Sequence, residues 1–161
     1  MDSLTRVSIQ HCTELSPAAE RVISAHLAHS NANNDPESNH AEAASELFVP
    51  GVRFWTAQLA GGDAVGCTAL RDLGRSQGEL KSMHVLPEAR GQGVAAALLE
   101  HVVTTARAEN YREILLETGS AEAYLAARNL YLSFGFTYCA PFADYTVDAN
   151  SVFMRLALAT G

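Results

Sequence analysis

The segment that most restricts the fold is a glycine-spaced turn that leads directly into a helix. Residues 90–95 read Arg-Gly-Gln-Gly-Val-Ala, and an apolar stripe at helical spacing begins at their end, formed by Ala95, Leu98, Leu99, Val102 and Ala106. A strand-like run, Gly78–Leu86, precedes the turn, and the short apolar run Glu113–Glu117 follows the helix. A strand, a helix and a second strand in this order are typical of α/β proteins.

The rest of the chain continues the alternation of strands and helices. Further strands are expected at Thr5–His11, Arg53–Ala60, Ala64–Leu70, Phe136–Ala140 and Ser151–Leu158. Gly61-Gly62-Asp63 predicts a hairpin between the second and third of these. Helices are expected after the capping pair Ser16-Pro17, from about His40, and over Ala121–Ser133 with Leu125, Leu130 and Phe134 on its buried side. The predicted order is β-α-α-β-β-β-α-β-α-β-β, a mixed α/β sheet in a single domain of residues 1–161.

Composition and charge argue against several classes of protein. With 161 residues, 48% hydrophobic and 18% charged, the chain can bury one ordinary globular core. The net charge is −7 and no cluster of lysine or arginine occurs, which disfavours a nucleic-acid partner. No apolar run reaches the ~20 residues of a membrane span, and the first residues lack a signal-peptide pattern. Cys12, Cys67 and Cys139 are widely spaced, so we expect no disulfide framework, no metal site and a reducing, cytoplasmic location.

The glycine turn is compatible with three interpretations. Gly91-x-Gly93-x-x-Ala96 matches a dinucleotide fingerprint, with Glu117 roughly 20 residues further on, although Leu86–Arg90 separate the strand from the first glycine. The second interpretation is a helix start whose glycines only allow close packing. The third is a pyrophosphate cradle, because the first amides of a helix have no helical acceptor and the helix dipole attracts anions. Glycines would then leave out Cβ atoms that block a diphosphate, and Arg90 would add a positive charge.

A second motif further along the chain favours the third interpretation. Ala127-x-x-Leu130-Tyr131-x-x-x-Gly135-Phe136 lies at the end of the last expected helix. Together with Arg90-x-x-Gly93-x-Ala95, which follows a strand, it resembles the paired motifs of the GNAT superfamily of N-acetyltransferases. The element order agrees with that family along nearly the whole chain. The segments ELKSM, LETGS and PFADYTVDANSVFM are similar to those of a bacterial branch of the superfamily, the YsnE-like group.

The resemblance implies a fold and a cosubstrate. A GNAT-like mixed central sheet carries helices on both faces and a parallel strand pair that splays apart, here Gly78–Leu86 and Glu113–Glu117. Acetyl-coenzyme A (acetyl-CoA) would lie in that cleft, with its pantetheine arm along the backbone of Met83, His84 and Val85. Its diphosphate would lie against Arg90, Gly91, Gln92, Gly93, Val94 and Ala95. A primary amine of a small molecule or a protein would attack the thioester directly in a ternary complex, with no metal.

Tyr131 occupies the position of the family's general acid, whose hydroxyl protonates the departing sulfur of the coenzyme. The alternative is that Tyr131 only packs against Phe134 and the sheet. The sequence departs from the family at Tyr124, where many members carry an asparagine that bonds the pantetheine, so that role is not transferred to this chain.

Glu79 matches the strand position of a glutamate base in some members of the family. A base is useful because a lysine-like amine has a pKa of ~10.4 and is protonated at neutral pH. The two-residue period of a strand would place Glu79 on one face with Lys81 and Met83. The alternatives are that Glu79 is a solvated carboxylate and that His40 is the base.

The acceptor is expected between segments 31–48 and 142–150, with His40, Glu117 and Asp144 as candidate contacts. The acidic balance of the chain favours a cationic acceptor through electrostatic steering. Two other functions stay open: a coenzyme A-binding interaction module without catalysis, and a dinucleotide-binding domain of Rossmann type. The sequence leaves the oligomeric state open, a homodimer included.

Overall fold

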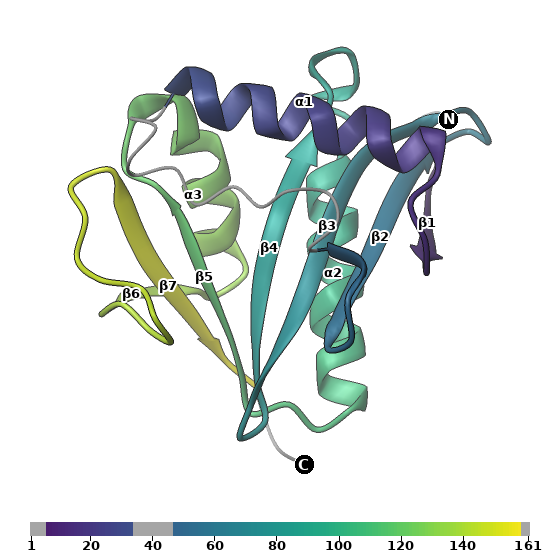
Figure 1. The fold of residues 1–161 in the computed structure, drawn as a ribbon. Helices are drawn as coiled ribbons and strands as arrows, with labels where there is room; N and C mark the ends of the chain where they lie inside the picture. Colours follow the sequence, from purple (N-terminus) through teal and green to yellow (C-terminus); the bar gives the residue numbers. More distant parts are fainter. Residues whose placement is uncertain (1–5, 34–46, 159–161) are drawn as a thin grey trace.

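The computed structural model describes residues 6–33 and 47–158, and its strands form one sheet in the order β1-β2-β3-β4-β5-β7-β6 (Figure 1). The strands are β1 (Val7–Cys12), β2 (Val52–Leu59), β3 (Ala64–Gly74), β4 (Gln77–Val85), β5 (Glu113–Gly119), β6 (Thr137–Cys139) and β7 (Ser151–Ala157). Strands β4 and β5 run parallel, and the other neighbouring pairs are antiparallel. The predicted mixed sheet with one parallel pair is confirmed.

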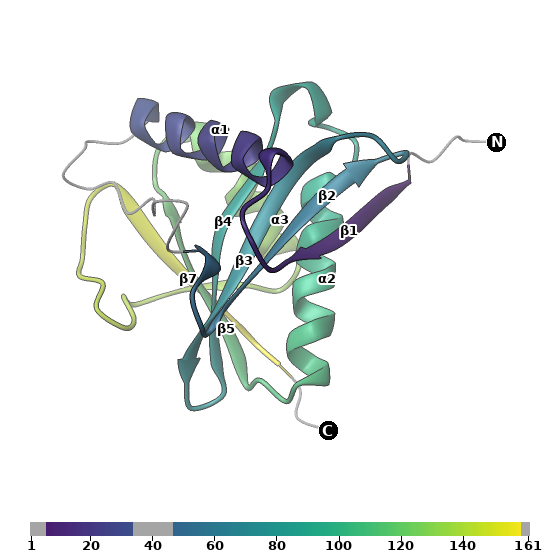
Figure 2. The same cartoon turned by 45° about the vertical axis from the view of Figure 1, so that its right-hand side comes forward.

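Helices cover both faces of this sheet, as predicted (Figures 1 and 2). They are α1 (Pro17–Asn33), α2 (Val94–Ala108) and α3 (Leu125–Ser133). We call the side covered by α1 the α1 face, and the side covered by α2 and α3 the α2 face. Within the described part of the chain, no helix is long and apolar enough to cross a membrane. The helix expected from about His40 falls outside the described residues.

Two apolar clusters, one on each face, hold the helices to the sheet. Neighbouring residues of β2 alternate between them: Phe54 is buried with α1, and Trp55 is buried with α2. This alternation follows from the two-residue period of a strand. Helix α1 begins where predicted, because the Ser16 hydroxyl accepts a hydrogen bond from the Ala19 amide at 3.1 Å. The hairpin around Gly61-Gly62-Asp63 is confirmed by the antiparallel pairing of β2 with β3.

Strands β4 and β5 diverge part-way along their length. Their pairing runs from Gln77 opposite Glu113 to Leu80 opposite Leu116 and stops there. Beyond that point β4 stays paired with β3 up to Val85, and β5 stays paired with β7 up to Gly119. Each strand is held by its outer neighbour, so a wedge opens between them, and Figure 1 shows the two strands separating from bottom to top.

A β-bulge in β4 corrects one prediction about the side chains that face this wedge. His84 pairs with Cys67 whereas Lys81 pairs with Ala69, so β4 contains one extra residue, and Ser82 has a positive φ of 56°. An extra residue reverses the alternation beyond it. Met83 therefore packs with the cluster on the α2 face instead of sharing a face with Glu79 and Lys81, as the simple two-residue period had predicted.

The last predicted helix is divided in two. Glu122–Tyr124 form one 3₁₀ turn, and α3 begins at Leu125. Leu125 is 45% exposed, so its expected place on the buried side is wrong, whereas Leu130 and Phe134 pack against the core. The Arg128 guanidinium donates hydrogen bonds to the carbonyls of Gly119 (2.7 Å) and Ala121 (2.9 Å), which ties the start of α3 to the end of β5.

Candidate active site

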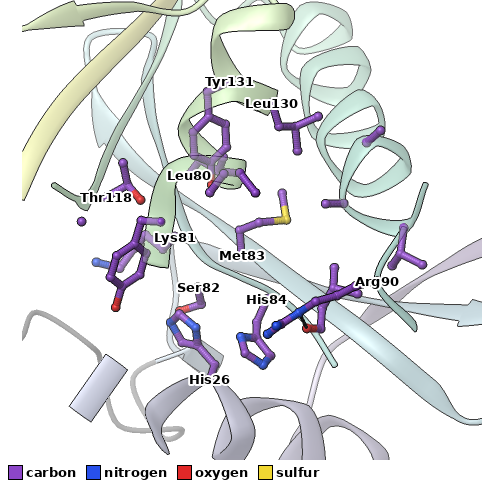
Figure 3. A pocket seen from close by; sticks show the side chains of 18 of the residues that line it. His26, Leu80, Lys81, Ser82, Met83, His84, Arg90, Thr118, Leu130 and Tyr131 are labelled. Atoms are coloured by element: carbon purple, nitrogen blue, oxygen red, sulfur yellow. Dashed lines mark hydrogen bonds between the residues drawn. The ribbon is translucent and has the colours of Figure 1, made fainter. Parts of the chain in front are cut away.

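A cavity of about 500 Å³ lies in the wedge between β4 and β5 (Figure 3). One wall is β4 from Glu79 to Val85, and the opposite wall is the end of β5 with the start of α3. The turn before α2 closes one end, and His26 of α1 lies at the opening on the α1 face. A cavity of this size is in the usual range for small-molecule sites. The wedge brings together parts of the chain that are far apart in the sequence.

The glycine turn forms one end of this cavity because of its backbone conformation. Gly91 has φ +79° and Gly93 has φ +81°, values that side chains with a Cβ rarely adopt. A Cβ built on either glycine meets no protein atom within 4 Å. Glycine is therefore required at these positions because the backbone is left-handed, and not because the helix packs closely there. The second interpretation, in which the glycines only allow close packing, is wrong.

The geometry of this turn leaves hydrogen-bond donors at the end of the cavity. Gly93 is the N-cap of α2, and its carbonyl accepts the first helical bond, from Ala97 at 3.0 Å. The amides of Val94 and Ala95 come before that bond, so the helix supplies them with no acceptor. Gly91, Gly93, Val94 and Ala95 line the cavity, and Gln92 lies outside its lining. Donors at a helix N-terminus suit an anionic group.

Arg90 lies beside these amides and is exposed, and its Nε donates to the Val85 carbonyl at 3.3 Å (Figure 3). Among the described strands, the pairing of β4 with β5 ends at Leu80, so the edge of β4 that follows is not covered by β5. Met83, His84 and Val85 all line the cavity there. A strand edge of this kind can pair with the amides of an extended ligand.

Tyr131 projects from α3 into the cavity (Figure 3) and is 5% exposed. Its ring packs against Phe136 at a centroid distance of 5.6 Å. Burial and, to a lesser degree, the Glu117 carboxylate raise the pKa of the Tyr131 hydroxyl above its usual value. The hydroxyl is therefore protonated at neutral pH, as a proton donor must be, and the ring also has the packing role that the alternative assigned to it.

Glu79 is 1% exposed, so the alternative of a solvated carboxylate is wrong. Its Oε2 accepts a hydrogen bond from the Tyr145 hydroxyl at 2.6 Å and lies 3.5 Å from Lys81 Nζ. Its Oε1 lies 3.8 Å from Arg71 Nη1, on the directly opposite residue of β3. The carboxylate thus faces the cavity within a network of one hydroxyl and two cations.

The three substrate candidates from the sequence have different places. Glu117 lines the cavity, and its Oε2 accepts a hydrogen bond from the Ser151 hydroxyl on β7. Asp144 is exposed and lies outside the lining. His40 falls outside the described residues.

Several lining residues were missed by sequence reasoning: His26, Ser82, Thr118, Tyr124, Tyr145, and Lys81 as a cavity group. A signal for Lys81 was present, because it is the only lysine in the chain and lies two residues from Glu79 on a strand. The Tyr124 ring packs directly over Gly119, where a Cβ would come within 2.2 Å of the ring, so this packing requires glycine at position 119. No local pattern indicated Tyr145, which a loop between β6 and β7 brings to Glu79.

The sheet topology excludes the dinucleotide interpretation. A Rossmann domain needs successive parallel strands joined by helices. Among the strands that the structure describes, β4 and β5 form the one parallel pair. The turn is also separated from β4 by a short 3₁₀ helix, Pro87–Ala89, instead of following the strand directly.

Comparison with known proteins identifies the family. The family model of the acetyltransferase (GNAT) domain matches residues 50–138. YsnE of Bacillus subtilis, named as an uncharacterized N-acetyltransferase, is 42% identical over 137 residues, which cover 85% of this chain and 90% of YsnE. YedL of Escherichia coli, also named as an uncharacterized N-acetyltransferase, is 37% identical, and the match covers 88% of this chain and 89% of YedL.

Solved structures agree with this assignment. The crystal structure of an acyl-CoA N-acyltransferase from Klebsiella pneumoniae has a TM-score of 0.77 and 26% identity, and the match covers 95% of this chain and 98% of that one. These matches also decide against a module without catalysis, because the relatives of high coverage are named as enzymes. The chain therefore belongs to the GNAT family and is an acetyltransferase.

Proposed function

We propose that this protein transfers the acetyl group of acetyl-CoA to a primary amine in a ternary complex, within one domain. The observation that carries the proposal is that Tyr131 and Glu79 line one cavity, which the glycine turn closes at its end. A proton donor, a carboxylate and an anion-binding turn are the parts that acyl transfer from a coenzyme to an amine requires.

The residues present suit acetyl-CoA. The amides that follow Gly91 and Gly93, with the charge of Arg90, would hold the diphosphate. The backbone edge of β4 at Met83–Val85 would pair with the pantetheine amides, and Leu130 and Ala127 add an apolar wall. When bound, acetyl-CoA would supply an activated acyl group on a thiolate leaving group.

Glu79 and Tyr131 would handle the two protons of the transfer. Glu79 takes one proton from the bound ammonium group, directly or through one water, and passes it to solvent. The free amine then forms its bond to the acyl carbon and releases its surplus proton to solvent. As the carbon–sulfur bond breaks, the Tyr131 hydroxyl gives its proton to the departing sulfur, and solvent then restores that proton. The Tyr145 hydroxyl, 2.6 Å from Glu79 Oε2, orients the carboxylate.

Two other properties are proposals of the same kind. The described cysteines Cys12, Cys67 and Cys139 are free thiols, which supports a reducing cytoplasm as the location. The acceptor can be a small molecule or an exposed amine of a protein.

The test is steady-state release of thiol from acetyl-CoA over a broad panel of amines. Tyr131→Phe is expected to lower kcat about 10²-fold, in the range for loss of a positioned proton donor, with little change in the affinity for acetyl-CoA. Tyr138→Phe is the matched control, because Tyr138 is 54% exposed on β6 and outside the cavity lining. Equal kcat values for these two variants would refute the role of Tyr131.

The same assay tests the carboxylate. Glu79→Gln is expected to lower kcat/KM most strongly near neutral pH, where the amine is protonated, and less at pH 9–10, where the free amine is more abundant. Glu100→Gln, on the exposed side of α2, is the control. A uniform loss across this pH range would assign Glu79 to binding instead of proton transfer.

A further inference from the structure

The cavity contains a buried pair of opposite charges beside the place where the amine must react. Glu79 and Lys81 lie on the α1 face of β4, and the Lys81 side chain is 7% exposed. Lys81 Nζ lies 3.5 Å from Glu79 Oε2 and 3.4 Å from the Tyr145 hydroxyl. Both residues line the cavity, and Figure 3 shows Lys81 beside Ser82 on its wall.

The charges around this pair do not cancel. Arg71 lies 3.8 Å from the other oxygen of Glu79, so one carboxylate is shared by two cations. Burying the charges of Glu79 and Lys81 costs free energy that their mutual attraction only partly offsets. The buried pair of Glu79 and Lys81 therefore adds little to the stability of the fold. Binding of a ligand by these two residues can account for the presence of the pair.

The rest of the wall beyond Lys81 is free of acidic groups among the described residues. Ser82 and His84 follow on β4, and the His84 ring packs edge-on against His26 of α1 at a centroid distance of 5.4 Å (Figure 3). The other carboxylate of the described lining is Glu117, which lies across the wedge on β5 and accepts a hydrogen bond from the Ser151 hydroxyl. The wall next to the base therefore suits an anionic group better than a cationic one.

We propose that the acceptor amine carries a carboxylate on the same carbon, as an α-amino acid does, and that Lys81 receives that carboxylate. This inference rests on the proposed function. The amine and the carboxylate of an α-amino acid are bonded to the same carbon, and the Glu79 carboxylate and Lys81 Nζ are similarly close to each other. The amine can therefore face Glu79 while the carboxylate faces Lys81. The overall charge of −7 suggested a cationic acceptor, but Lys81 places a positive charge on the cavity wall beside Glu79.

The first experiment changes the acceptor and leaves the protein intact. Each common α-amino acid is compared with its carboxamide by thiol release at one pH. The carboxamide has the less basic amine, so amine basicity alone would favour the carboxamide. We expect kcat/KM to be at least tenfold higher for the acid in at least one pair. The inference is overturned if no pair reaches a tenfold preference.

The second experiment uses the fact that Lys81 is the only lysine in the chain. Labelling with ¹⁵N-lysine gives a single Nζ site, which can be followed by NMR in protein saturated with coenzyme A. We expect the Nζ resonance to shift and saturate with the preferred amino acid and to stay in place with its carboxamide. Equal responses to the two ligands, or none, would count against Lys81 as the receptor.

Variants at position 81 complete the test. Lys81→Met is expected to bring the acid-to-carboxamide ratio of kcat/KM close to one, and Lys81→Arg to keep part of the preference. Arg107→Met, on the exposed end of α2, should keep the full ratio. If Lys81→Met does not fold, the two experiments on the intact chain decide.

Failure of this inference is distinguishable from failure of the proposed function. Turnover of amines with no preference for the acid leaves the transferase in place and overturns the carboxylate receptor. A saturating Nζ response to an amino acid without thiol release from any amine supports the receptor and overturns the proposed reaction. If there is neither an Nζ response nor thiol release, both the carboxylate receptor and the proposed reaction are overturned.

Discussion

At the scale of the residue, Tyr131 illustrates how one side chain serves both packing and chemistry. It is the buried residue of α3, and its ring touches Phe136 while it lines the cavity. Burial raises its pKa because ionisation would place a charge where water cannot solvate it. The same burial that positions the hydroxyl therefore keeps it protonated for transfer.

The raised pKa has a consequence for stability at alkaline pH. In the unfolded chain Tyr131 ionises near pH ~10, whereas in the folded protein it keeps its proton, so the free energy of unfolding falls as pH rises past that point. Tyr131→Phe should reduce this fall by about 1.4 kcal/mol per pH unit above pH ~10. Urea denaturation from pH 9 to 11 measures the slope. Tyr138→Phe, at a 54% exposed site, is the matched control, and equal slopes in the two variants would contradict the assignment.

At the scale of the element, the position of α2 depends on a glycine that no motif contains. Gly66 of β3 faces the first turn of α2, and a Cβ there would lie 2.8 Å from Val94 Cγ1 and 3.2 Å from both Leu98 Cδ1 and the His84 carbonyl. The missing side chain lets the helix start approach the sheet beside β4. This close approach places the amides of the glycine turn at the end of the wedge.

Adding one methyl group at this contact tests the packing. Gly66→Ala is expected to lower the free energy of unfolding by about 1–3 kcal/mol, the usual cost of overpacking a tight contact. Chemical denaturation measures the loss, with Val94→Ala as the single-variant control. The double variant Gly66→Ala with Val94→Ala should lose less than the sum of the two single variants, because the smaller side chain relieves the clash. Strict additivity would show that α2 does not press on Gly66.

At the scale of the whole molecule, the wedge is a property of the sheet and not of any one strand. The β4–β5 pair ends at Leu80 and Leu116, and β3 and β7 hold the two diverging ends. A ligand that fills the wedge contacts both halves of the sheet. Its binding should therefore stabilise the entire fold instead of one segment.

Thermal unfolding with and without ligand checks this expectation. A ligand at 100 times its Kd adds about 2.7 kcal/mol, which corresponds to a rise in Tm of roughly 5–11 °C for a chain of this length. We expect such a rise with acetyl-CoA and with coenzyme A, and no rise with NAD at the same concentration. A comparable rise with NAD, or none with acetyl-CoA at millimolar concentration, would contradict the assignment of the wedge.

Most strands and helices and the two motifs could be predicted from the sequence, since these depend on periodicity and on residues close together in the chain. Apolar stripes define α2, and a glycine doublet marks the hairpin, so both could be predicted locally. The two motifs together resemble those of the GNAT family, and this resemblance led to the roles expected of Glu79 and of the glycine turn. Even there the reason for Gly91 and Gly93 was only partly foreseen, because a positive φ is visible only in the folded backbone.

The surroundings of the reacting groups depend on long-range contacts that only the folded chain makes. The bulge at Ser82 moved Met83 to the α2 face, and a bulge arises from pairing with β3 instead of from the sequence of β4. Tyr145 reaches Glu79 across 66 positions of the chain, and Arg71 reaches it from the neighbouring strand. Contacts at such separations leave no periodic trace in the sequence, because they depend on how the whole sheet closes around the wedge.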